Sequence, residues 1–199
     1  MSTPVRLLLL VAALCSPIRD AVAEPVRDCG IAVTASHAGD AYVVEVKLDV
    51  PAPVRTTWDV FTDWDHMANF AANLRSSRVI ERSGNVLRVE QQGQSTFGPL
   101  KFDFDYVREV RLVPYEKYDF HLVRGTFRRF DAEVRFENAN RSTRVVYHAQ
   151  FAPKQWAPVV LGLVLIRLNA REQFLQLCEE IVRRHHGTAA SPSNTATKK

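Results

Sequence analysis

The strongest constraint on the fold is an alternation of apolar and charged residues in the second half of the chain. Between residues 101 and 112, the aromatic residues Phe102, Phe104 and Tyr106 alternate with two aspartates. Successive side chains of a β-strand point to opposite faces of a sheet. This segment is therefore predicted to be a strand with one apolar and one charged face. Because short turn segments separate several such strands, we predict an antiparallel sheet with one face in water.

The same pattern predicts seven strands and three helices. Pro51 and Pro53 end the first strand, because proline cannot donate a hydrogen bond to the ladder, and proline suits the start of the next helix. The predicted strands span residues 41–50, 76–81, 86–94, 101–112, 118–124, 127–137 and 144–151. The predicted helices span residues 54–63, 65–70 and 158–184. The expected fold class is α+β, with a curved seven-stranded antiparallel sheet around a long C-terminal helix and two short helices after strand one.

An apolar stretch, WAPVVLGLVLIRL at residues 156–168, begins the long helix. Its thirteen residues are interrupted by Arg167, and spanning a bilayer takes about 20. A helix that is apolar on all sides is buried or contacts lipid. We interpret the stretch as the wall of a cavity, with plain core as the alternative. Trp156, Val159 and Leu163 could also contact a membrane during ligand exchange.

The 199 residues suit a single domain. Residues 1–23 are predicted to be a signal peptide, because one positive charge precedes LLLLVAALC and Ala21-Val22-Ala23 fits a cleavage site. An uncleaved anchor is the alternative. Residues 24–40 are expected to be a loose lead-in, 41–184 the folded domain and 185–199 a disordered tail. The protein is therefore expected to be periplasmic or secreted.

Two cysteines, Cys29 and Cys178, follow the predicted cleavage site. In an oxidising compartment they could form a disulfide that joins the mature N-terminus to the long helix. The alternative is a buried free Cys178 and an unpaired Cys29.

Motifs for metal binding, phosphate binding or nucleophilic catalysis are not evident. Asp63, Asp65 and His66 lie close together, but no second cluster at ligand spacing supports them, and helix ends favour Asp. Neither Gly-x-Ser-x-Gly nor a dinucleotide fingerprint occurs. The net charge of +4 is too weak to indicate nucleic acid. We therefore expect no catalytic residue, metal, cofactor or nucleic-acid partner.

The residues WDVFTDWDHM at 58–67, followed by Phe70, Asn73-Leu74 and SSRV at 76–79, resemble the opening of the START-like, or SRPBCC, superfamily. The nearest branch is the polyketide cyclase/dehydrase group, which also holds coenzyme-Q-binding proteins; GNVLRVEQ at 84–91 and GTFRRF at 125–130 are similar to its later segments. The resemblance covers residues 42–184 and implies a helix-grip fold with an internal apolar cavity. Ala71-Ala72 stands where similar sequences tend to have a proline.

The aromatic residues, 11 Phe, 5 Tyr and 3 Trp, are the best functional signal. A START-like sheet has more inward surface than one helix covers, so some of them should line a cavity. Ligand pockets are mostly apolar with few polar anchors, and Gln91 and Tyr147 are the candidate anchors. The candidate ligand-binding residues are Phe70, Val89, Gln91, Phe102, Phe104, Tyr106, Phe120, Leu122, Phe130, Tyr147, Val160, Val164 and Leu168.

The resulting hypothesis is a monomeric, exported protein that binds a lipid or isoprenoid quinone for sequestration or transfer. One alternative is a cyclase or dehydratase acting on a polyketide-like aromatic substrate, which would require a titratable pair inside the cavity. Another is an interaction module whose core is filled by its own side chains, which a cavity below roughly 300 Å³ would favour.

Overall fold

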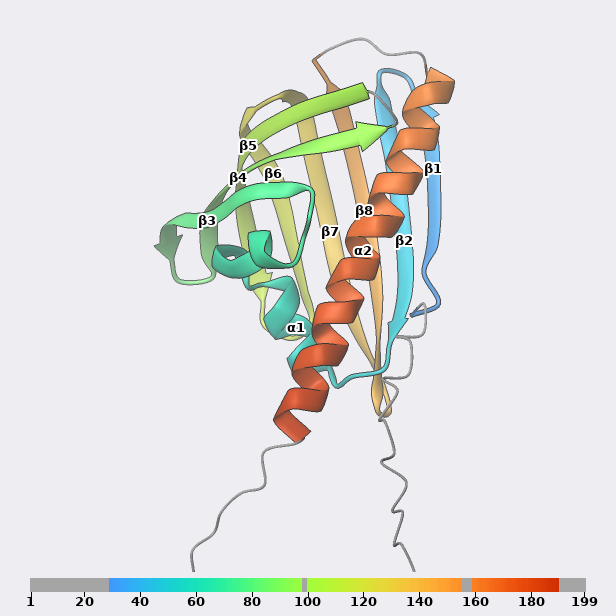
Figure 1. Cartoon of the computed structure of the whole chain (residues 1–199). Coiled ribbons are helices and arrows are strands. Elements are labelled where there is room, and N and C mark those ends of the chain that lie inside the picture. Colours follow the sequence, from blue (N-terminus) through green and yellow to red (C-terminus); the bar gives the residue numbers. More distant parts are fainter. Residues whose placement is uncertain (1–28, 98–99, 155–158, 190–199) are drawn as a thin grey trace, which may run out of the picture.

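The computed structural model describes residues 29–97, 100–154 and 159–189, which form one curved antiparallel sheet with a long helix across its concave face (Figure 1). The strands follow the order β1-β2-β8-β7-β6-β5-β4-β3 across the sheet. The strands are β1 (Ala32–Ala38), β2 (Ala41–Val50), β3 (Leu74–Ser83), β4 (Val86–Phe97), β5 (Leu100–Val113), β6 (Lys117–Gly125), β7 (Phe127–Ala139) and β8 (Ser142–Pro153). The predicted α+β class and wrapped sheet are confirmed, but the described sheet has eight strands, not seven.

The additional strand is β1, which lies in the segment expected to be a loose lead-in. It pairs with β2 in antiparallel register, from Ala32 opposite Lys47 to Ala38 opposite Ala41. Only Ala35 of this strand is buried. Because its apolar side chains are few and small, β1 has little of the apolar–polar alternation that predicts the other strands.

Two short helices follow β2, as predicted. The helices of the described chain are α1 (Val54–Phe61), the 3-10 helix η1 (Trp64–Asn69) and α2 (Val159–Ala189). After η1, the backbone N–H of Ala71 donates to the Met67 carbonyl and that of Ala72 to Gln176 Oε1, both at 2.9 Å. A proline has no N–H to donate. The two alanines therefore allow this loop to be hydrogen-bonded to α2.

α2 is fastened to the sheet edge by its arginine side chains. Arg167 Nη2 donates to the Ala35 carbonyl at 3.0 Å, and Arg171 Nη1 donates to the Ile31 carbonyl at 3.1 Å. An unpaired sheet edge exposes backbone groups that invite association with other chains. Packing α2 beside β1 covers part of this edge and fixes the helix over the sheet.

A disulfide adds a covalent link between the same elements. It joins Cys29, just before β1, to Cys178 of α2, with the two Cα atoms 6.6 Å apart. The helix then continues to Ala189, so residues 185–189, expected in a disordered tail, are helical. The predicted signal peptide and residues 190–199 lie outside the described residues.

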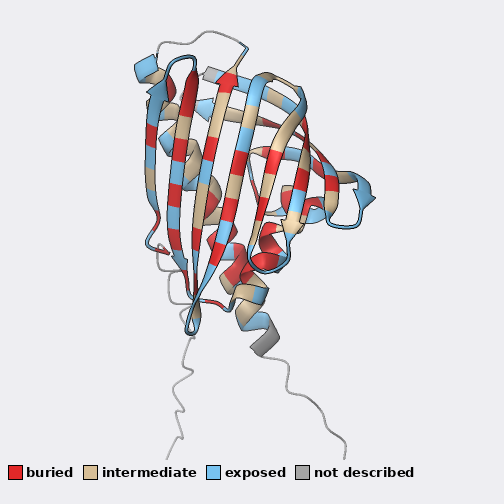
Figure 2. Cartoon of the chain, turned by 180° about the vertical axis from the view of Figure 1, so that it is seen from behind, coloured by how far each residue is buried: buried red, intermediate tan, exposed pale blue. Residues whose placement is uncertain are grey.

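The inner face of the sheet supplies most of the core, and bands of buried and exposed residues alternate along the strands (Figure 2). At the end that holds α1 and η1, aromatic rings fill the space. Phe136 lies 5.2 Å from Trp58 and 5.3 Å from Phe61 between ring centroids, and Trp64 lies 5.8 Å from Tyr118. This aromatic cluster closes one end of the fold.

Candidate ligand-binding cavity

An apolar cavity of about 360 Å³ lies between the sheet and α2. Its lining comes from β2, from β4 to β8, from α1 and η1, and from the first two-thirds of α2. Small-molecule sites typically occupy about 300–1,000 Å³ and are mostly apolar. The cavity is therefore larger than the roughly 300 Å³ below which a core filled by its own side chains would be favoured.

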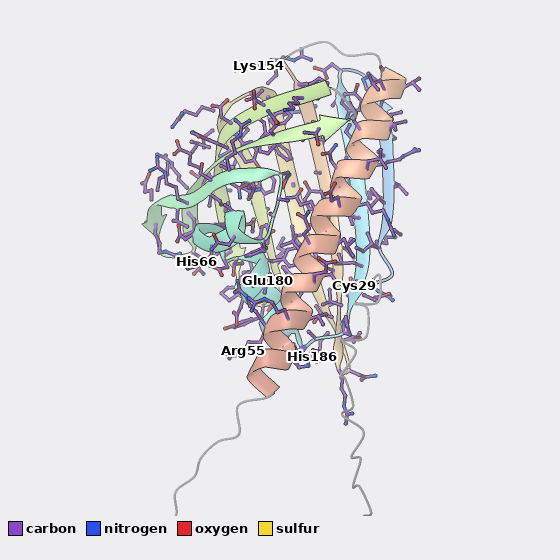
Figure 3. All side chains as sticks on the ribbon, viewed as in Figure 1. Cys29, Arg55, His66, Lys154, Glu180 and His186 are labelled. Carbon is purple, nitrogen blue, oxygen red and sulfur yellow. A yellow bond between two sulfur atoms is a disulfide. The ribbon has the colours of Figure 1, made fainter. Side chains whose placement is uncertain are left out.

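The cavity has a rim and a floor. The rim includes Phe102, which is 38% exposed, and Lys154, which lies at the end of β8 near the start of α2 (Figure 3). The floor includes Phe61, Met67 and Tyr118, beside the aromatic cluster. Because exposed side chains line the rim, the cavity opens to solvent at that end.

Arg108 is a buried cation that lines this apolar cavity and is not among the predicted ligand-binding residues. Arg108 is only 8% exposed. Its guanidinium carbon lies 4.4 Å from the centroid of the Phe120 ring and 5.6 Å from that of Tyr106. Among the described residues, no carboxylate forms an ion pair with it, and its buried Nε has no hydrogen-bond partner.

Burying an unpaired charge costs several kcal/mol, and favourable contacts with aromatic faces offset about 2 kcal/mol or somewhat more. The Arg108 guanidinium is therefore held by packing and not by charge pairing. Its donors are available to a molecule inside the cavity.

The hydroxyls of Tyr118 and Tyr147 are further hydrogen-bond donors among the polar residues of the lining. Burial raises the pKa of Tyr118 to about 12, and it also raises the pKa of Tyr147, although the charge of Arg108 lowers both. Both phenols therefore stay protonated at neutral pH and can donate hydrogen bonds. In the described part of the chain, neither hydroxyl has a partner. We call Arg108, Tyr118 and Tyr147 the donor cluster.

The structure brings some of the predicted ligand-binding residues together on β5 to β8. Alternation along these strands turns many of their aromatic side chains inward, although the β5–β6 and β7–β8 pairings each contain a register shift. The predicted residues that line the cavity are Phe102, Phe104, Phe120, Phe130 and Tyr147.

Gln91, predicted as an anchor, is instead engaged by the protein itself. Its Nε2 donates to Ser77 Oγ at 2.9 Å, and its Oε1 accepts from the Tyr106 hydroxyl at 2.8 Å. The amide is therefore satisfied without a ligand. Other predicted residues that are not part of the described lining are Phe70, Val89, Tyr106 and Leu122.

The apolar residues predicted on α2 face away from the cavity. Val160, Val164 and Leu168 are 76%, 41% and 51% exposed. The lining residues of this helix segment include Gly162 and Ile166 instead, which lie on the opposite face. Because this segment is apolar on all sides, its sequence pattern could not indicate which face of the helix lies toward the cavity. Trp156 lies outside the described residues.

The acidic cluster near η1 makes structural contacts. Asp63 Oδ1 lies 2.6 Å from His66 Nδ1, and Asp63 Oδ2 accepts from Arg184 of α2 at 2.8 Å. Asp65 accepts from the Val79 backbone N–H at 2.7 Å. Within residues 29–97, 100–154 and 159–189, no group of three or more His, Cys, Asp or Glu side chains is placed to hold a metal ion, and no helix is long and apolar enough to cross a membrane.

An antiparallel sheet wrapped around a long helix, with an apolar cavity between them, defines the helix-grip class of proteins. Solved structures share this arrangement at low sequence identity. The Zhui aromatase/cyclase of Streptomyces sp. R1128 is 14% identical with a TM-score of 0.62, over 72% of this chain and 95% of that chain. Human STARD10 is 14% identical with a TM-score of 0.58, over 80% of this chain and 76% of that chain. The STAR-related lipid transfer protein of Xanthomonas axonopodis is 10% identical with a TM-score of 0.56, over 77% of this chain and 99% of that chain.

The family follows from the sequence itself. The family described as "Polyketide cyclase / dehydrase and lipid transport" matches residues 50–176, which is more than half of the chain. The chain belongs to this family, and its resemblance to the START-like superfamily is confirmed. A search of curated protein sequences found no match.

Proposed function

We propose that this protein is an exported carrier that binds a hydrophobic small molecule, a lipid or an isoprenoid quinone, for sequestration or transfer. The observation that carries this proposal is the apolar cavity of about 360 Å³ between the sheet and α2. Burying apolar ligand surface contributes about 25 cal/mol per Å² before the costs of binding are subtracted. The family description, which includes lipid transport, agrees with a binding role.

A cyclase or dehydratase is the rival function, because the donor cluster could polarise a carbonyl group. Such an enzyme also needs a base. Among the described lining residues the only carboxylate is that of Asp103. Hydrogen bonds from Gln94 and Arg75 and the charge of Arg75 hold the pKa of Asp103 below its usual value. This exposed, already paired carboxylate is a weak base, which favours binding over catalysis.

Two observations support export. The N-terminal segment has the charge, apolar run and small residues of a signal peptide. The disulfide between Cys29 and Cys178 is of a kind that persists in oxidising compartments. The carrier would therefore work in the periplasm or outside the cell.

The outer face of α2 supports transient contact with a membrane. The exposed residues Val160, Val164 and Leu168 are spaced four apart and form one apolar stripe. This stripe lies on the helix that also contributes Gly162 and Ile166 to the cavity wall. If this stripe inserted into a membrane surface, the cavity rim would contact the same membrane.

Native mass spectrometry of the mature protein from its own host tests the carrier function. We expect a bound lipid or quinone at a near-stoichiometric amount, recovered by organic extraction. The protein mixed with a total lipid extract and then dialysed serves as a second sample. A ligand-free mass in both samples would contradict the proposal and favour the cyclase alternative.

A further inference from the structure

We infer that the ligand is an acidic amphiphile whose carboxylate binds the donor cluster, so that it enters the cavity with its charged head first. This inference rests on the proposed carrier function and names the chemical class of the ligand. Arg108 is more than nine-tenths buried, lines the cavity and has no carboxylate partner among the described residues. A guanidinium presents donors in a planar fork that matches a carboxylate.

The surroundings of Arg108 select a single small anion and not a large polar head. The guanidinium packs against the Phe120 and Tyr106 rings. The other polar groups of the donor cluster are the hydroxyls of Tyr118 and Tyr147. The charge of Arg108 acts on both phenols, so the three donors are near enough to serve the two oxygens of one carboxylate. Rings that contact them are those of Phe120, Phe136 and Phe174.

The depth of the cluster sets the direction of the ligand. Arg108 lies six residues along β5 from Phe102 at the rim, which corresponds to roughly 20 Å of extended strand. The lining between them includes the aromatic residues Phe104 and Phe130. A ligand anchored at Arg108 would therefore place an apolar chain along these rings and point its tail toward the rim.

Cavity size favours a single chain. A volume of about 360 Å³ lies near the lower end of the range for small-molecule sites. A monocarboxylate with one alkyl chain meets the demands of charge, direction and volume together. A neutral quinone or alcohol would leave the guanidinium without a counter-charge.

Equilibrium dialysis of the full mature protein against three probes of equal chain length tests this inference. The probes are dodecanoate, 1-dodecanol and dodecylamine. We expect dodecanoate to bind about 10- to 150-fold more tightly than 1-dodecanol, because a hydrogen bond to a charged group is stronger than a neutral one. Dodecylamine should bind most weakly. Equal binding of dodecanoate and 1-dodecanol would overturn the inference and leave the carrier function standing, whereas binding of neither would contradict the carrier function.

Variants locate the effect. Arg108→Gln should lose the preference for dodecanoate and keep its affinity for 1-dodecanol, and Arg108→Lys should keep part of the preference. Arg111→Gln is the control, because Arg111 lies on the same strand, is exposed and pairs with Glu109. Circular dichroism checks that each variant folds. An unchanged preference in folded Arg108→Gln, or an equal loss for both probes, would overturn the inference. Should Arg108→Gln not fold, the wild-type probe ratio and the Arg108→Lys variant still decide.

Discussion

Tyr118 is a buried residue at the floor of the cavity, and its hydroxyl has no hydrogen-bond partner within the described chain. Burial raises its pKa from the ordinary 10.0 to about 12. Below pH 10 the phenol is protonated in both the folded and the unfolded protein, so it adds no pH dependence. Between pH 10 and about 12 the unfolded chain ionises while the folded protein keeps its proton, so the free energy of unfolding must fall as pH rises.

We therefore expect Tyr118→Phe to flatten part of this alkaline fall in stability. Urea denaturation near pH 8 and near pH 11 measures it. Tyr115→Phe, at an exposed tyrosine in the β5–β6 turn, is the matched control and should retain the full fall. An equal decrease in the free energy of unfolding between pH 8 and pH 11 in wild type and in Tyr118→Phe would show that Tyr118 reaches solvent in the folded state.

Arg108 shows how residue parity could have found the donor cluster. It shares its inward face with Phe102, Phe104 and Tyr106, since all four positions are even in one uninterrupted register with β4. In a strand whose apolar and polar residues alternate, a charged residue is normally expected on the solvated face. Sequence alone could not show that aromatic rings would shield this one, because the nearer ring, that of Phe120, comes from β6.

At the scale of elements, the two faces of α2 have different predicted roles. Ile166→Trp places a large ring in the cavity, so we expect less lipid bound per protein after incubation with a total lipid extract. Val164→Asp alters only the exposed stripe, so we expect unchanged lipid uptake but slower transfer from phosphatidylethanolamine–phosphatidylglycerol vesicles. Native mass spectrometry measures uptake, and a vesicle transfer assay measures rate. If both variants behaved like wild type, the assignment of the two faces would be wrong.

The elements that could be predicted are those with strong periodicity. Strands β2 and β4 to β8 each bury large apolar side chains on one face, and their predicted bounds lie within three residues of those observed. The strand β1 could not be predicted, because it is stabilised by pairing with β2 and by contacts with α2. Neither interaction is visible in the residues of β1 itself. The face of α2 that lines the cavity could not be predicted either. The first turns of this helix are apolar on every side, so their sequence does not distinguish the inner face from the outer one.

At the scale of the whole molecule, export and the disulfide make one joint prediction. A fusion of residues 1–40 to a periplasm-dependent reporter should be active. Protein recovered from the periplasm should begin at Glu24 and should leave Cys29 and Cys178 unlabelled by an alkylating reagent until it is reduced. A chain lacking residues 1–23 is the control and should stay inside the cell with both thiols reactive. A silent reporter would place the protein in the cytoplasm.

The described chain begins at Cys29 and ends in α2 beyond His186, and both residues lie away from Lys154 and the cavity rim (Figure 3). The polypeptide therefore enters and leaves the described part of the molecule at the pole opposite the cavity mouth. A protein immobilised through a side chain next to His186 on a biosensor chip would thus face the flowing solution with its cavity mouth. Under the proposed carrier function, a copy held at this pole would present its cavity to a facing surface.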